Sequence, residues 1–255
     1  MENLTIIKTG GEVVEDEHAL PQLLHDFALI SGYKMLVHGG GRSATKIATL
    51  LGIESRMIDG RRITDSEMLK VVTMVYGGLV NKNIVARLQA LSINALGLTG
   101  ADMNVILSDK RPVGKIDYGF AGDVKKVNGQ LLASIIRQGI VPVMAPLTHD
   151  GHGSMLNTNA DTIAAETACA LATSFDVTLV FCFEKKGVLL NPDDEDSVIP
   201  ELTRDYYHKL VNAKAIQGGM IPKLDNAFHA IDSGVKKVII TAASAIATNG
   251  GTCIH

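Results

Sequence analysis

Apolar runs alternate with helix-period stretches along the chain. The runs LTIIK, KMLVH, IVPVMAP, VTLVFCF and KKVIIT are continuously apolar, which is typical of strands buried on both faces of a parallel sheet. The spacing of apolar residues predicts helices in GQLLASIIRQG and over residues 18–31, 42–52, 159–173, about 203–217 and 220–233. This order predicts an α/β fold with a mainly parallel central sheet.

The middle of the chain is less regular. Asp59-Gly60 lies between two β-like arms in SRMIDGRRIT, which is a strong signal for a two-residue hairpin. One long helix is expected over about 65–91, followed by a strand in INALGLT. Residues 104–127 are expected to form an irregular antiparallel patch. The acidic stretch NPDDEDS, residues 191–197, is expected to be a solvated turn.

Composition and charge narrow the class of protein. The chain has 255 residues, a net charge of -3 and 46% hydrophobic residues, enough for one large domain or two lobes around a buried core. A nearly neutral charge argues against a general nucleic-acid binder. The N-terminus lacks the basic-then-apolar pattern of a signal peptide. The most apolar stretch, 162–183, contains Glu166 and Asp176, so a helix and a strand are expected there, not a membrane span.

A metal site in the protein is not predicted. The three cysteines show no CxxC and no metal-like spacing, and they are expected to be reduced thiols of a cytoplasmic protein. His38, His149 and His152 lie among glycine and aspartate residues. They are expected to be loop residues rather than ligands.

Two glycine clusters fall where predicted strands end. Lys8-Thr9-Gly10-Gly11 follows the first strand, and His38-Gly39-Gly40-Gly41-Arg42 follows the second and opens a helix. Ligands of open α/β sheets bind beyond the carboxyl ends of strands, and consecutive glycines let backbone N–H groups approach phosphate oxygens. Tight βα turns would explain either cluster alone, whereas the pair with its lysine favours an anion. Neither cluster is a Walker P-loop or a GxGxxG fingerprint.

Polar residues mark the starts of two later helices. Asn159 fits an N-cap and Asp161 fits a first-turn acid favoured by the helix dipole, which leaves Asn157 unexplained. Asp161 is also suited to holding lysines in place. Lys223 follows Pro222 near a helix start, where a cation is unfavourable. It is therefore either solvated or placed beside an anion.

Arg61 and Arg62 follow the expected hairpin turn. Adjacent strand residues face opposite sides, so one arginine is expected to point inward and the other into solvent. An inward arginine suits a carboxylate, which it binds through paired hydrogen bonds.

Six stretches resemble the amino acid kinase family, and more narrowly its N-acetylglutamate kinases of arginine biosynthesis. They are IIKTGG, VHGGGR, GRRITDSEMLKVVTMVYGGLVNKNIV, ALGLTGAD, MLNTNAD and GGMIPK, and they span nearly the whole chain in the expected order. HGGG alone is a weak signal, but the ordered set is specific. VNKNIV, NTNAD and GGMIPK point away from aspartate, uridylate and carbamate kinases. The resemblance implies a three-layer αβα sandwich with two lobes.

The resemblance also implies an activity. It is phosphoryl transfer from MgATP to the γ-carboxylate of N-acetyl-L-glutamate or another N-acyl-L-glutamate, which gives an acyl phosphate. Carried over by position, Lys8 and Lys223 flank the transferring phosphoryl group, and Asp161 orients the two lysines. The attacking carboxylate is already ionised, so catalysis consists of positioning and charge neutralisation.

Further site residues follow from the same resemblance. Four glycines donate backbone hydrogen bonds to the phosphoryl group or to the attacked carboxylate. They are Gly10 and Gly11 on the phosphate side and Gly40 and Gly41 on the substrate side. Arg62 and Asn157 hold the other polar groups of the substrate.

The family pattern divides the chain into two lobes. Residues 1–173 are expected to bind the acylamino acid and to form the dimer, and residues 174–255 are expected to bind the nucleotide. Mg²⁺ is expected to be held mainly by ATP oxygens and water. Lys8 lies only seven residues from Met1, whereas arginine-inhibited relatives carry an extra N-terminal helix that links dimers into hexamers. A homodimer insensitive to arginine is therefore expected, with neither nucleic acid nor membrane as a partner.

Two stretches depart from the family pattern. FEKKGVLLNPDD places Glu184 and Lys185 where relatives carry an aspartate and a valine near the nucleotide ribose. Nucleotide contacts are expected at Glu184, Gly187 and Met220. YGFAGDV, residues 118–124, departs from the usual Val-Gly pair of the substrate-side hairpin. This departure raises the hypothesis that a bulkier acyl group such as succinyl is accepted.

Several alternatives remain open from the sequence. A kinase of the same fold acting on N-succinylglutamate or on carrier-linked α-aminoadipate would share these motifs, and the pocket around Arg62 decides between them. A nucleotide-binding regulatory or storage protein is the alternative without catalysis. Retention of Lys8, Asp161 and Lys223 argues against it. A Rossmann dehydrogenase would need a GxGxxG after a strand, and the sequence contains none.

Overall fold

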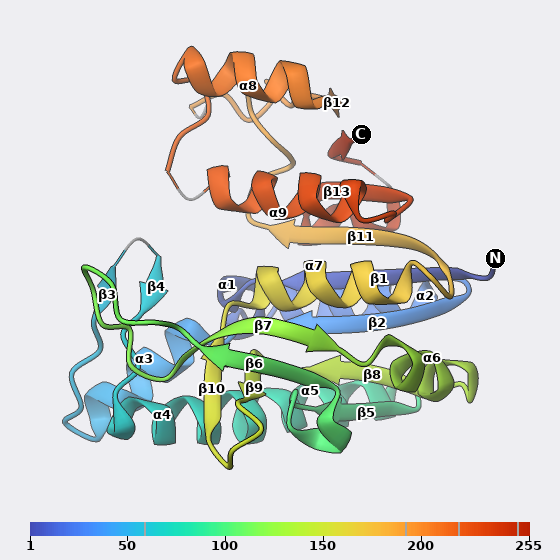
Figure 1. Cartoon of the computed structure of the whole chain (residues 1–255). Coiled ribbons are helices and arrows are strands. Elements are labelled where there is room, and N and C mark those ends of the chain that lie inside the picture. The colour runs from blue at the N-terminus through green and yellow to red at the C-terminus, as the bar shows by residue number, and fades with distance from the viewer. Residues whose placement is uncertain (59, 192, 219, 249) are drawn as a thin grey trace.

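One sheet runs through the molecule (Figure 1). The computed structural model describes residues 1–58, 60–191, 193–218, 220–248 and 250–255. In spatial order, the strands of the sheet in this part of the chain are β12 (Glu201–Leu202), β14 (Thr252–Ile254), β13 (Lys237–Ala242), β11 (Asp176–Phe183), β1 (Asn3–Thr9), β2 (Tyr33–His38), β8 (Val141–Met144) and β5 (Ala95–Leu98). Within this sheet, all neighbouring described strands are parallel except β13 and β14. The predicted mainly parallel central sheet is confirmed.

Helices cover both faces of this sheet, as Figure 1 shows. One face carries α6 (Gly129–Arg137), α7 (Ala160–Leu171), α8 (Arg204–Asn212) and α9 (Met220–Asp232). The other carries α1 (Gly11–Glu15), α2 (Ala19–Leu29), α3 (Gly41–Leu50), α4 (Ser66–Val72), α5 (Asn81–Ala90) and the 3₁₀ segment Ala243–Thr248. Successive strand residues point to opposite faces, so Ile6 packs in the first core and Ile7 in the second. The three-layer αβα sandwich is confirmed.

A second, smaller sheet lies beside the first. Its strands are β10 (Met155–Thr158), β7 (Ala121–Val127), β6 (Ile106–Lys110) and β9 (Leu147–His149), and they close on themselves. β6 and β7 are antiparallel, with a register shift between Leu107 and Ser108. A short 3₁₀ turn, Asp102–Asn104, precedes β6. The antiparallel patch expected over 104–127 is therefore confirmed.

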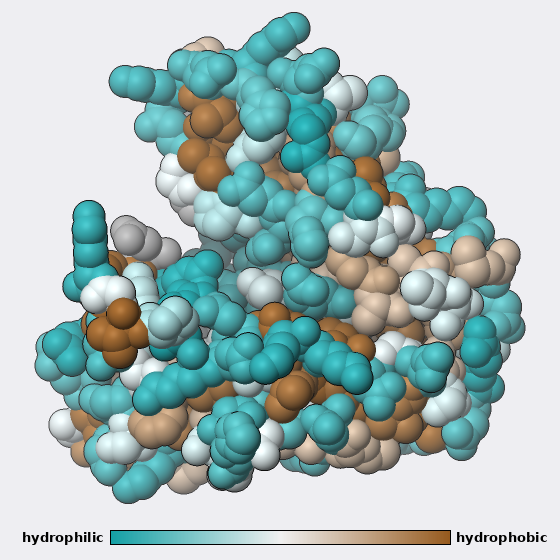
Figure 2. Space-filling model, viewed as in Figure 1, coloured by the Kyte–Doolittle hydropathy of each residue, from teal (hydrophilic) through white to brown (hydrophobic). Residues whose placement is uncertain are grey.

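The expected hairpin is formed by β3 (Met57–Ile58) and β4 (Arg61–Arg62), which pair antiparallel. Gly60 in the turn has a φ of 72°, a region that favours glycine. Asp59, the other residue of the expected turn, lies outside the described residues. Figure 2 shows the surface hollowed between this hairpin and the C-terminal part of the chain.

The long helix expected over 65–91 is continuous but not uniform. α4 begins after Asp65, which accepts a hydrogen bond from Met68 N at 2.8 Å. A π-helical segment, Thr73–Val80, then joins α4 to α5. The segment contains the Gly77-Gly78 pair, which has low helix propensity, and such wide turns often occur at functional sites.

Short elements escaped the sequence prediction. They are α1, β9, β10, β12, β14 and the 3₁₀ segments, and each is too short to show a period. The acidic stretch 191–197 is more than a solvated turn. Lys186 Nζ lies 3.0 Å from Asp196 Oδ1, and Lys185 Nζ lies 3.5 Å from Glu195 Oε1. All four side chains are exposed, so each pair adds little to stability.

Cys169, Cys182 and Cys253 are free thiols, as expected. None of the helices in the described part of the chain combines the length and the apolar character that a membrane crossing needs.

Replacement of Leu36 by alanine is expected to lower the free energy of unfolding by about 2–5 kcal/mol. Leu36 lies on β2 at the centre of the sheet and is fully buried, so the truncation leaves a cavity. Urea denaturation followed by circular dichroism measures the change. Leu190→Ala is the matched control, because Leu190 is 49% exposed and lies in the C-terminal part of the chain. Equal losses in the two variants would contradict this assignment of the core.

Candidate active site

β1 and β2 end side by side, so the two predicted glycine turns meet. Gly39 N donates to Thr9 O at 2.9 Å. A Cβ on Gly39 would lie 2.8 Å from Gly11 N, and one on Gly11 would lie 3.2 Å from Gly41 N. Side chains there would push the two turns apart, so glycine is needed for the close approach of the backbones. The predicted phosphate-side and substrate-side glycines therefore form one surface.

The imidazole of His38 supports the second glycine turn. Its Nδ1 lies 2.7 Å from Gly39 O, and its Nε2 lies 3.1 Å from Asn81 Nδ2. Burial lowers the pKa of His38 to about 4, so the ring is neutral at pH 7. Nδ1–H then donates to Gly39 O, and Nε2 accepts from the Asn81 amide. His38 is the last residue of β2 and fully buried, so its expected place in a loop is wrong, because the strand extends to it.

Lys8 and Asp161 form a buried ion pair. Lys8 lies one residue before the end of β1, on the same face as Ile6, and thus faces α7. Its Nζ is 2.6 Å from Asp161 Oδ1. Asp161 lies in the first turn of α7. The N-cap Asn159 fixes this turn, because its Oδ1 accepts from Asp161 N at 2.8 Å and from Thr162 N at 3.1 Å.

Lys223 approaches the same point from the first turn of α9. Its Nζ lies 3.7 Å from the centroid of the Phe183 ring, and Lys8 Nζ lies 5.7 Å from it. Burial lowers the pKa of Lys223 and the charge of Lys8 lowers it further, while Asp161 and Glu184 act in the opposite direction. The three predicted catalytic residues therefore come together around one aromatic ring. Lys223 is half-buried, so it is not simply solvated.

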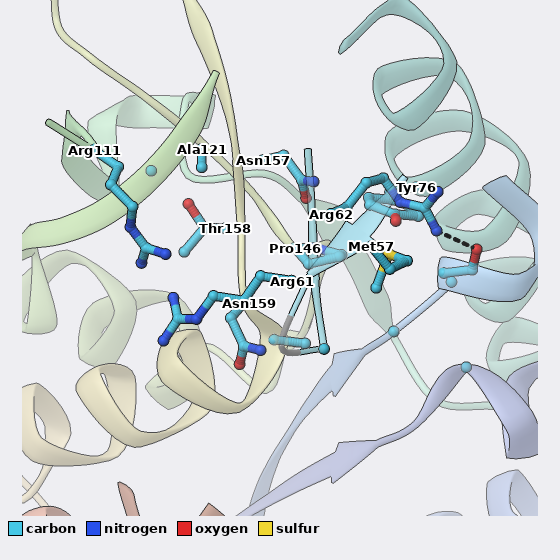
Figure 3. Close-up of a pocket in the computed structure, with 17 residues that line it drawn as sticks. Met57, Arg61, Arg62, Tyr76, Arg111, Ala121, Pro146, Asn157, Thr158 and Asn159 are labelled. Atoms are coloured by element: carbon cyan, nitrogen blue, oxygen red, sulfur yellow. Dashed lines mark hydrogen bonds between the residues drawn. The ribbon is translucent and has the colours of Figure 1, made fainter. Parts of the chain in front are cut away.

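A cavity of about 280 Å³ opens next to this charged cluster (Figure 3). The four predicted substrate-side residues line it: Gly40, Gly41, Arg62 and Asn157. Gly11 lines it as well, and Asp161 directly follows the lining residue Ala160. The cavity therefore lies next to the site where Lys8 meets Asp161.

Arg62 and Asn157 are held by neighbouring groups. Arg62 is buried, and its Nη2 donates to Gly41 O at 2.8 Å and to Thr45 Oγ1 at 3.0 Å. A further donor, Nη1, is hydrogen-bonded to Ser55 Oγ. Asn157 Nδ2 donates to Thr64 Oγ1 at 2.9 Å. Both side chains are therefore positioned before any ligand binds.

The expectation that one of the two hairpin arginines points into solvent is wrong. Arg61 is half-buried and lines the same cavity as Arg62. Each arm of the hairpin is only two residues long and stands at the cavity mouth, so both of its faces border a hollow. The alternation itself holds, because Arg62 turns toward α3 and Arg61 turns away from it (Figure 3).

Other residues of the site gave weaker signals in the sequence. Phe183 is the last residue of an apolar strand. This position is its one sequence signal for a role in the site, because ligands bind beyond strand ends. Tyr76 lines the cavity from the π-helical segment, and a Cβ on Gly40 would lie 2.9 Å from its ring. Arg111 also lines the cavity, and no sequence motif singled it out.

The predicted nucleotide-side residues lie in separate settings. Glu184 is exposed, and its Oε1 is 3.8 Å from Arg42 Nη2. A Cβ on Gly187 would lie 2.8 Å from Thr252 Oγ1, so tight packing explains that glycine. Met220 begins α9 and packs on the first core. Of the three, Glu184 is the residue that acts on the charged cluster, because its negative charge raises the pKa of Lys223.

Comparison with known proteins gives a consistent result. The model of the amino acid kinase family matches residues 3–242. A Bacteroides thetaiotaomicron protein named acetylglutamate kinase is 70% identical over 253 residues, which cover 99% of this chain and 98% of that protein. A Methanopyrus kandleri protein of the same name is 37% identical over 256 residues, covering 99% of this chain and 100% of that protein.

Solved structures agree in fold. A Streptococcus mutans protein has a TM-score of 0.82 and 26% identity, with 98% of each chain covered. The N-acetylglutamate synthase of Neisseria gonorrhoeae, crystallised with coenzyme A and N-acetyl-glutamate, also has a TM-score of 0.82. At 23% identity, over 98% of this chain and 59% of that one, it shows the fold alone. The glycine turns and the Lys8–Asp161 ion pair lie in the matched region. Because the family model matches residues 3–242, the chain belongs to the amino acid kinase family.

Proposed function

We propose that the protein phosphorylates the γ-carboxylate of N-acetyl-L-glutamate, or of another N-acyl-L-glutamate, with ATP in arginine biosynthesis. The observation that carries the proposal is the Lys8–Asp161 ion pair beside a cavity lined by arginines and glycine turns. The name acetylglutamate kinase, borne by relatives 70% identical over nearly the full chain, supports it.

The residues suit an in-line transfer that needs no general base. A γ-carboxylate oxygen of the substrate attacks the γ-phosphorus of ATP, and a new O–P bond forms. The bond from that phosphorus to the β–γ bridging oxygen breaks, and ADP leaves with the electron pair. A glutamate side-chain carboxyl has a pKa of about 4.3, so it is already ionised at pH 7. The protein supplies position and positive charge.

Each group in the site has a part in this transfer. Lys8 and Lys223 neutralise the charge that spreads over the phosphoryl oxygens, and Asp161 keeps both ammonium groups in place. The N–H groups of the Gly10-Gly11 turn face the phosphate, and those of the Gly40-Gly41 turn face the attacking carboxylate. Arg62 and Asn157 hold the remaining polar groups of the substrate.

ATP and Mg²⁺ belong to the C-terminal side of the site. Residues 174–255 form the nucleotide lobe, with contacts at Glu184, Gly187 and Met220, and residues 1–173 form the lobe for the acylamino acid. Within the described residues, no group of three or more His, Cys, Asp or Glu is arranged to hold a metal. Mg²⁺ would be held mainly by ATP oxygens and water, and it would supply neutralising positive charge beside the lysines.

The protein acts as a cytoplasmic homodimer that joins through the N-terminal lobe. Most exposed large apolar side chains of the described residues lie between residues 1 and 173, and Leu50, Leu51 and Met74 are 81%, 56% and 55% exposed. Exposed apolar side chains of this size are typical of interaction surfaces when they are contiguous.

Purified protein with MgATP, N-acetyl-L-glutamate and hydroxylamine is expected to form a hydroxamate, because hydroxylamine captures an acyl phosphate. Colour with ferric ion measures the product. Reactions without the amino acid, or with free L-glutamate, are the controls. Absence of hydroxamate with every N-acyl-L-glutamate tried, despite ATP binding, would refute the proposed function.

Lys8→Met is expected to lower kcat by about 100- to 1,000-fold, the usual loss on removing one charge-stabilising donor. Methionine is unbranched and only one atom shorter than lysine, but it carries no charge. The hydroxamate assay measures the rate, and ATP binding with circular dichroism checks the fold. Lys70→Met is the matched control, since the Lys70 side chain is 67% exposed and its ion-pair partner among the described residues is Glu67. Equal rates in Lys8→Met and the parent protein would contradict the role of Lys8.

The rate is expected to fall with rising pH earlier than an ordinary lysine would cause, because burial lowers the pKa of Lys223. The neutral amine no longer balances phosphoryl charge, so the effect is a loss of kcat on the alkaline side. Lys223→Arg keeps its charge there and is expected to move the fall to higher pH. The measurement is kcat against pH for both proteins. Coincident alkaline limbs would exclude Lys223 as the titrating group.

A further inference from the structure

The cavity carries more positive charge than N-acetyl-L-glutamate needs. Arg61, Arg62 and Arg111 line it, and none of the described residues in its lining is acidic. N-acetyl-L-glutamate has two carboxylates. One meets the phosphoryl group between the lysines, and the other suits Arg62. Arg61 and the edge of Arg111 that does not bond to Asp123 are then left beside an acyl group that has no charge.

The Arg61 guanidinium has no partner among the residues that the structure describes. Arg62 donates to three protein acceptors. The side chain of Arg61, whose backbone pairs with Ile58, has no hydrogen-bond or ion-pair partner among the described residues. It is nevertheless half-buried at the cavity wall. A guanidinium that is withdrawn from water without a partner is costly. Its donors are therefore available to a ligand.

Arg111 is held in one orientation by groups outside the cavity lining. Its Nε lies 3.1 Å from Asp123 Oδ2 and 3.2 Å from Oδ1, and its Nη2 also bonds to Asp123. The guanidinium carbon lies 5.4 Å from the centroid of the Tyr118 ring. One edge of the guanidinium is thus occupied by Asp123. The Nη1 side remains for a ligand, with its plane fixed in advance.

The guanidinium groups of Arg61 and Arg111 point toward each other across the cavity, close to Thr158 (Figure 3). They reach this point from β4 and from the end of β6, two elements far apart in sequence. Two cations that face each other repel unless an anion lies between them. Convergent arginines of this kind are typical of carboxylate and phosphate sites.

The wall between these two arginines is made of small residues. Ala121 and Gly122 line it. A Cβ on Gly122 would lie 2.6 Å from Thr158 Oγ1, so no side chain fits at that position. The short Ala121 side chain leaves the room for an acyl group longer than acetyl.

We propose that the acyl group of the preferred substrate ends in a carboxylate, which binds between Arg61 and Arg111. The substrate is then an N-(carboxyacyl)-L-glutamate, with N-succinyl-L-glutamate as the member tested. This inference rests on the proposed kinase function, because it concerns the remote end of the same substrate. Arg61 is the specificity-determining residue, and Asp123 is a positioning residue that acts through Arg111.

The test compares three substrates in the full chain with MgATP. They are N-succinyl-, N-butyryl- and N-acetyl-L-glutamate, and kcat/KM is measured for each. The butyryl group has the length of succinyl without its charge, so it separates size from charge. The parent protein is expected to prefer the succinyl over the butyryl substrate by about 10- to 100-fold, as for a hydrogen bond to a charged group. Arg61→Leu is expected to abolish most of that ratio.

Arg56→Leu is the matched control, because Arg56 is an exposed arginine just before the same hairpin. It is expected to keep the succinyl-to-butyryl ratio of the parent protein. Equal or better use of the acetyl or butyryl substrate by the parent protein would overturn the inference and leave the kinase function standing. An unchanged ratio in Arg61→Leu would also overturn it. Turnover of none of the three would overturn the proposed function itself. The substrate comparison in the parent protein decides even if Arg61→Leu fails to fold.

Discussion

Two lysines converge on one buried aspartate, and the rest of the site depends on this arrangement of charge. Lys8 pairs with Asp161 at 2.6 Å, and Lys223 shares the neighbouring Phe183 ring with Lys8. A single carboxylate balances one of the two cations, so the cluster retains a positive charge in a partly buried setting. Only an incoming anion completes that balance. The ends of β1, α7 and α9 must therefore meet at one point.

The second constraint is the contact between two turns of bare backbone. Gly39 and Gly11 approach so closely that a Cβ cannot be inserted between them, and neutral His38 holds the second turn from beneath through Asn81. Backbone N–H groups fixed in this way do not have to reorganise during phosphoryl transfer, which is the usual origin of electrostatic catalysis. The positions of these backbone N–H groups are therefore fixed by the packing of the two glycine turns and by the buried His38 and Asn81 side chains.

Long periodic elements could be predicted from the sequence, and so could residues in compact motifs. β1, β2, β11 and α7 were evident from apolar runs and spacing, and Lys8, Asp161 and Lys223 were accessible through their motifs. Arg111 and the inward course of Arg61 were not. Both arginines line one cavity, from β4 and from the end of β6. These segments are about fifty residues apart, and local sequence pattern does not encode their approach. The π-helical turn that brings Tyr76 to Gly40 likewise depends on packing.

The position of β1 has a consequence for how the chain is made. β1 is synthesised before the other described strands, yet it lies in the middle of the sheet, between β2 and β11. On the ribosome its β2 side can pair as soon as residues 33–38 emerge, but its other edge waits for residues 176–183. Such an unpaired apolar edge is open to wrong partners. Assembly of the central sheet, and with it the charged cluster, is therefore a late event that closes over a long stretch of chain.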